Sequence, residues 1–147
     1  MNKNTGFTLI EVLIAMLVLA VGLLGLAGMQ ATSLKNNQSA YNRSQATQLA
    51  YDLADRMRAN IAEKTIYTTI LPSSASPKQK CLTRTGCSPA EMAENDLFEW
   101  KATINSLPSG KGTITVTDNV FTITVIWDDD KDGDDSNNFG FQTSFKL

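Results

Sequence analysis

The feature that most constrains this chain is an apolar run close to its N-terminus. From Val12 to Met29, 18 consecutive residues carry no charge and no strongly polar side chain. As an α-helix, the longer segment from Phe7 to Met29 would span roughly 34 Å, and a hydrocarbon core is about 30 Å thick. The run therefore predicts a membrane-spanning helix.

One acidic residue, Glu11, lies inside this apolar segment. The 13 Leu, Ile, Val and Phe residues of the segment favour insertion by about 0.3–0.6 kcal/mol each, whereas one central acid costs about 2.5–3.5 kcal/mol. The summed free energy therefore favours membrane insertion. Lys3, which lies before the run, predicts a cytoplasmic N-terminus. An acid within a membrane segment indicates a functional role. Its natural partner is an N-terminal ammonium group, from its own chain or from a neighbour.

An ordinary secretory signal peptide and a plain membrane anchor are the alternatives for this segment. A signal peptide has an apolar core of about 7–15 residues that ends in an Ala-x-Ala type of cleavage site. The core here is longer, and no such site closes it before the polar region that starts at Gln30. A plain anchor leaves Glu11 unexplained.

The residues around Glu11 resemble a processing motif. The sequence GFTLIEV at positions 6–12 is similar to the class III leader of type IV prepilins. The resemblance implies that prepilin peptidase removes residues 1–6 by cutting between Gly6 and Phe7, that Phe7 is then N-methylated, and that Glu11 acts in assembly. It also favours the ammonium group of a neighbouring subunit as the partner of Glu11.

Helical periodicity continues beyond the membrane segment. No Gly or Pro lies between Gln30 and Glu63, so one helix is predicted from about Phe7 to about Ala62. Its second half, residues 30–63, carries one apolar stripe. The stripe consists of Leu34, Tyr41, Leu49, Leu53, Met57 and Ile61.

The remaining residues, 64–147, are predicted to form a small head domain. Residues 65–80 indicate a loop, with a short strand at 66–71 as an option. Cys81 and Cys87 are expected to form a disulfide, because a translocated domain lies in an oxidising compartment. The sequence SPAE at 88–91 is a capping box, which predicts a helix to about Ser106. Its buried side would contain Met92, Leu97, Trp100 and Ile104.

Three alternating segments complete the head. Residues 113–117 and 121–127 flank Asp118-Asn119, which predicts a hairpin, and residues 139–147 form a third strand. Such a sheet has one apolar face that can cover the helical stripe. The predicted fold is α+β, with a long N-terminal helix packed on a small antiparallel sheet, as in pilins. Its segments are a leader (1–6), a membrane half-helix (7–29), an amphipathic half-helix (30–63) and the head (64–147).

An aspartate loop separates the last two strands. Asp128, Asp130, Asp132 and Gly133 match the first half of a D-x-D-x-D-G calcium loop, and Asp134 is a fourth candidate ligand. The twelfth position, where such loops place Glu, is Phe139. Calcium is therefore the one cofactor left open, and the alternative is a solvated hairpin loop.

Composition narrows the functions. The chain has no histidine, only two cysteines and a net charge of −2, which disfavours an enzyme, a zinc site and a nucleic-acid partner.

A second resemblance, to the PilV-type minor pilins, is carried by residues 87–93, 96–97, 99–101, 107–108 and 110. We therefore expect a minor type IV pilin that is held in the bacterial inner membrane, with its head in the periplasm, and then takes part in assembly or priming of the pilus fibre. Its partners would be prepilin peptidase, other major and minor pilins, and the inner-membrane assembly platform. The alternatives are a pseudopilin of type II secretion and a membrane-tethered, periplasmic calcium-binding module.

Overall fold

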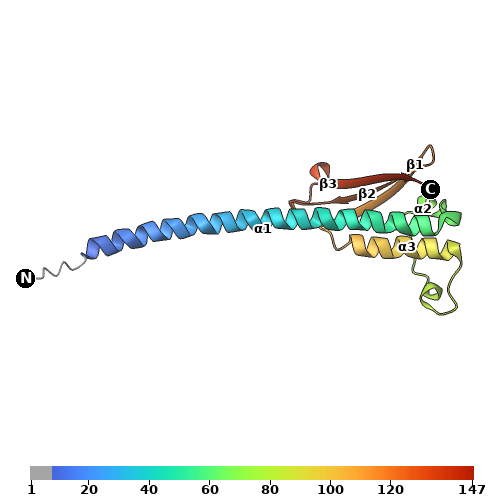
Figure 1. The fold of residues 1–147 in the computed structure, drawn as a ribbon, viewed down its shortest axis with the longest axis horizontal. Coiled ribbons are helices and arrows are strands. Elements are labelled where there is room, and N and C mark those ends of the chain that lie inside the picture. Colours follow the sequence, from blue (N-terminus) through green and yellow to red (C-terminus); the bar gives the residue numbers. More distant parts are fainter. Residues whose placement is uncertain (1–7) are drawn as a thin grey trace, which may run out of the picture. The chain divides into compact units, whose positions relative to one another are not determined.

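The structure, a computed structural model, describes residues 8–147. The described chain divides into two compact units, the first ending at Ser39 and the second comprising Ala40–Leu147. Helix α1 contributes to both units. In chain order the elements are α1 (Leu9–Ala59), η1 (Ile61–Glu63), α2 (Ile66–Thr69), η2 (Gln79–Leu82), α3 (Pro89–Ile104), β1 (Lys111–Thr117), β2 (Val120–Trp127), η3 (Asp135–Asn137) and β3 (Phe139–Lys146), where η denotes a 3₁₀ helix (Figure 1).

In the first unit, α1 carries the apolar run. Every residue of α1 from Leu9 to Gln38 is exposed. The helix is long and apolar enough to cross a membrane. The apolar side chains of residues 9–29 are exposed to solvent in the described chain, so a lipid environment or other subunits are needed to remove them from water.

In the second unit, the rest of α1 packs with α3 and the sheet around one apolar core (Figure 1). Strand β2 alternates strictly between partly buried and buried residues, and its buried side faces this core. The indole N–H of Trp100 on α3 donates to the Leu49 carbonyl of α1 at 2.8 Å. Strand β1 lies against α3, because a Cβ added to Gly112 would approach the Trp100 ring to 2.6 Å.

The three-stranded sheet has the order β1-β2-β3, and both neighbouring pairs are antiparallel. Asp118 and Asn119 connect Thr117 to its partner Val120. Their φ angles are +50° and +62°, which is the geometry of a two-residue type I′ hairpin. The predicted α+β fold, with its long helix and its three antiparallel strands, is confirmed.

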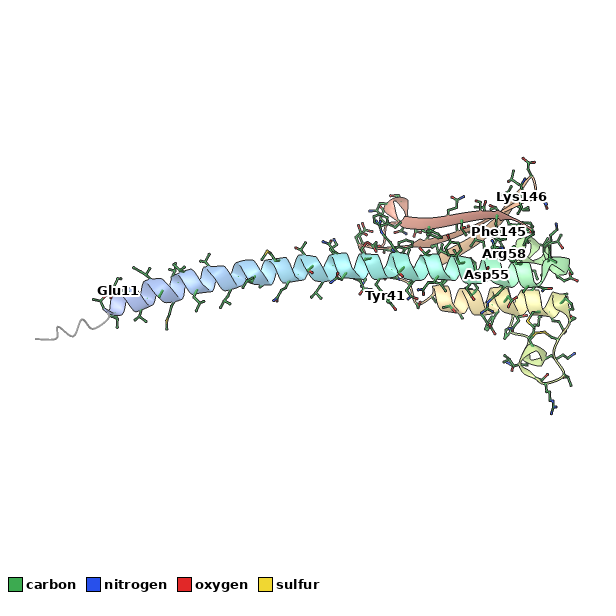
Figure 2. The ribbon with its side chains drawn as sticks, in the orientation of Figure 1. Glu11, Tyr41, Asp55, Arg58, Phe145 and Lys146 are labelled. Carbon is green, nitrogen blue, oxygen red and sulfur yellow. A yellow bond between two sulfur atoms is a disulfide. The ribbon has the colours of Figure 1, made fainter. Side chains whose placement is uncertain are left out.

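Strand β3 lies along the flank of α1. The guanidinium of Arg43 is 4.6 Å from the centre of the Phe139 ring. That of Arg58 is 4.8 Å from the centre of the Phe145 ring, and both of these residues are labelled in Figure 2. Between these pairs, the rings of Tyr51 and Phe141 are 6.0 Å apart. The three contacts follow the same order along both elements, so β3 and this part of α1 run side by side.

The predicted helical stripe is only partly buried. Leu49, Leu53 and Met57 are buried, whereas Tyr41 is 59% exposed and Ile61 is 52% exposed. The buried positions of α1 instead include three alanines, Ala46, Ala50 and Ala54, together with Asn42. Small side chains such as alanine let neighbouring elements approach the helix closely. Similarly, Met92 of α3 is exposed.

Helix α1 ends earlier than predicted, and α2 replaces the optional strand at 66–71. The helical turn of α2 takes part in a polar network with α1 and α3. The hydroxyl of Tyr67 donates to Asp96 Oδ2 at 2.7 Å, and Arg56 donates to Asp96 Oδ1 at 3.0 Å. Burial and the hydrogen bond to Asp96 raise the pKa of Tyr67, so its hydroxyl keeps its proton. The helical turn of α2 therefore brings Tyr67 to the carboxylate that joins α1 to α3.

Tyr67→Phe is expected to lower the free energy of unfolding of the head. Asp96 loses a donor in a buried setting, and a hydrogen bond to a charged group contributes about 1.5–3 kcal/mol. Urea unfolding of the detergent-solubilised chain, followed by tryptophan fluorescence, measures the change. Tyr51→Phe is the control, because Tyr51 is half exposed. An equal change in both variants would contradict the role of the Asp96 network.

Candidate processing and assembly site

Glu11 lies in the first turn of α1 (Figure 2) and forms a capping box with Thr8. Its Oε2 atom accepts from the Thr8 N–H at 2.8 Å and from the Thr8 hydroxyl at 2.9 Å. The Glu11 N–H donates to Thr8 Oγ1 at 3.4 Å. The T-x-x-E pattern before an apolar run could have identified Thr8 from sequence, as S-x-x-E identified the box at α3.

The capping box gives Glu11 two hydrogen-bond donors from its own chain. This lowers the cost of placing a carboxylate at the start of an apolar helix, because hydrogen bonds offset part of the cost of removing a charged group from water. The predicted processing residues Gly6 and Phe7 lie outside the described residues. The pairing of Glu11 with an ammonium group, and its role in assembly, stay predictions.

The capping box predicted at the start of α3 is present. Ser88 Oγ accepts from the Glu91 N–H at 3.2 Å, and a Glu91 carboxylate oxygen accepts from the Ser88 N–H at 2.9 Å. Pro89 occupies the first turn. The same reciprocal capping box therefore begins both long helices, once at the membrane end and once in the head.

A disulfide joins Cys81 and Cys87 immediately before α3. It closes the short loop that leads from η2 to α3, and neither cysteine of the sequence is left as a free thiol. Because a disulfide sulfur cannot act as a thiolate nucleophile, the bond has a structural role in this loop.

Alkylation of the denatured, unreduced protein is expected to label no thiol. Replacing both Cys81 and Cys87 by Ser should lower the free energy of unfolding by about 2 kcal/mol, since the closed loop is short. Intact mass after alkylation measures the first result, and urea unfolding measures the second. Two labelled thiols in the wild-type protein isolated from membranes would contradict the disulfide.

The aspartate loop is organised around Asp128, which is only 3% exposed. Its N–H donates to the Pro108 carbonyl at 2.9 Å. Its carboxylate accepts from the Lys131 N–H at 2.7 Å and from the Gly133 N–H at 3.1 Å. Gly133 has a φ of +79°, a conformation that glycine adopts without steric cost. Asp128 therefore fixes the path of the loop.

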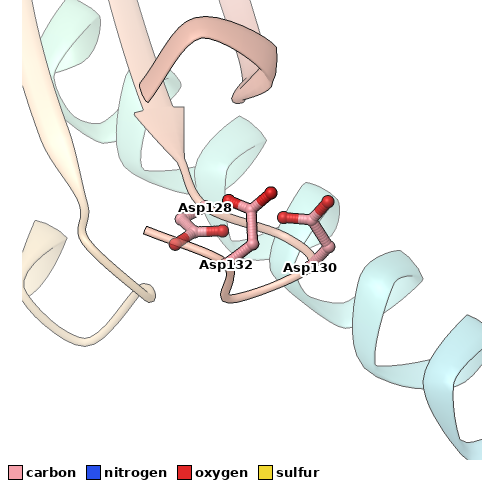
Figure 3. A group of neighbouring side chains, drawn as sticks. All are labelled: Asp128, Asp130 and Asp132. Carbon is pink, nitrogen blue, oxygen red and sulfur yellow. The ribbon is translucent and has the colours of Figure 1, made fainter. Parts of the chain in front are cut away.

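Three of the four candidate ligands come together. One carboxylate oxygen each from Asp128, Asp130 and Asp132 lies within 4.8 Å of the others (Figure 3). Asp134 lies outside this group, and its carboxylate accepts from the Ser136 N–H at 2.9 Å. The side chain at the twelfth position, Phe139, stacks on Trp127 with ring centres 6.3 Å apart. The arrangement can offer oxygen ligands from three side chains.

Comparison with protein families gives two adjacent matches. The family model of the prokaryotic N-terminal methylation motif matches residues 1–27. The Tt1218-like family model, described as type IV pilin Tt1218, matches residues 28–98. No curated protein and no solved structure matches the chain. Glu11 thus lies in the first match and Asp96 in the second, whereas the aspartate loop lies beyond both.

Proposed function

Because the chain belongs to the type IV prepilins, we propose that it is a minor type IV pilin. Pilins are structural subunits, and we propose no catalytic activity for this one. The observation that carries the proposal is a methylation motif over residues 1–27 that is continuous with an exposed, membrane-length helix. A helix of this kind can be held in a membrane and later covered by the helices of neighbouring subunits.

The proposed sequence of events follows from the order of these segments. The chain inserts with its N-terminus in the cytoplasm and its head in the periplasm. Prepilin peptidase cuts between Gly6 and Phe7, and the new terminus is methylated. The subunit then leaves the bacterial inner membrane through the assembly platform and joins other major and minor pilins in the pilus fibre, where it takes part in assembly or priming.

The finer assignment as a PilV-type minor pilin rests only on the resemblance to that group within residues 87–110. Within this segment the structure has a capped amphipathic helix with buried Leu97, Trp100 and Ile104, and packing alone accounts for these residues. A minor pilin is a low-abundance subunit, so the chain should form a small fraction of the subunits in sheared pili.

A deletion strain distinguishes a pilus subunit from a pseudopilin of type II secretion. The match of residues 28–98 to a type IV pilin model favours the pilus. Loss of the gene should reduce sheared pili and leave protein secretion at the wild-type level, and the wild-type gene should restore the pili. Normal piliation with lost secretion would overturn the proposal in favour of the pseudopilin.

Calcium binding by the aspartate loop is a second proposal, favoured by the convergence of Asp128, Asp130 and Asp132. Calcium should raise the melting temperature of the chelator-treated protein, because bound cations stabilise the folded state. Asp130→Asn should remove this increase, and Asp118→Asn in the β-hairpin should retain it. Differential scanning fluorimetry with and without calcium measures the shift. An unchanged wild-type melting temperature in saturating calcium would indicate a solvated loop.

A further inference from the structure

No further inference is drawn: the strongest candidate, the groove of about 270 Å³ that lies between residues 67–73 and the edge strand β1, is an unpartnered apolar surface, and nothing in the structure shows what covers it.

Discussion

Glu11→Ala should still be inserted and cleaved, but its amount in sheared pili should fall about a hundredfold or more relative to wild type. Insertion is kept because the apolar run is unchanged, and cleavage is kept because Gly6 is unchanged. Assembly should fail because the carboxylate is the proposed partner of an ammonium group in a medium of low dielectric constant. Breaking such a pair leaves one buried charge uncompensated, which costs about 3–5 kcal/mol.

Two further variants separate the charge of Glu11 from its capping role. Glu11→Gln removes the charge, but its amide oxygen can still accept from Thr8. Glu91→Ala removes the corresponding capping bonds at α3 and leaves the membrane segment intact. We expect Glu11→Gln to fail like Glu11→Ala, and Glu91→Ala to assemble.

The amounts of each variant in sheared pili and in cross-linked membrane complexes, relative to wild type, measure the effect. Wild-type amounts of Glu11→Ala in both fractions would show that Glu11 is not an assembly residue. Normal assembly of Glu11→Gln alone would assign the role to hydrogen bonding and not to charge.

Gly6→Val should block leader removal almost completely and leave membrane insertion intact. By resemblance to the prepilin motif, Gly6 is the residue directly before the proposed cut. A β-branched side chain there restricts the backbone and crowds the peptide bond that the peptidase must reach. Intact mass of the protein extracted from membranes should therefore show residues 1–6 retained, and the variant should be absent from pili.

Gly22→Ala is the matched control for this experiment. Gly22 lies within the apolar run, and a Cβ built there meets nothing within 4 Å in the described chain. The control should be cleaved as wild type is, with a methylated Phe7 at its new terminus. Cleavage of Gly6→Val at the wild-type rate, or a wild-type cut after Ala20 or Ala27, would contradict the predicted processing site.

Features that depend on neighbouring residues could be predicted from the sequence. The membrane-length run, the capping box at Ser88 and Glu91, and the Asp118-Asn119 turn all follow from chemistry within a few positions of the chain. The alternation in β2 likewise predicted which of its side chains are buried, because a strand places successive residues on opposite faces. The Thr8–Glu11 box is equally local, and its pattern was present in the sequence.

The tertiary structure decided which side chains of a periodic pattern are buried and which distant polar groups meet, because periodicity alone does not specify either. Spacing placed Tyr41 and Leu53 on one helical face, but only the positions of α3 and the sheet determine that Leu53 is buried and Tyr41 is exposed. The same holds for Asp96, which has donors from α1 and α2 at sequence separations of 40 and 29 residues. No local pattern encodes such contacts, since they depend on where the chain brings distant elements together. The sequence by itself thus determined the long helix and the strands, and it predicted a leader whose removal stays a prediction. The packing of the second unit decided which side chains form its core and which polar groups hold α1, α2 and α3 together.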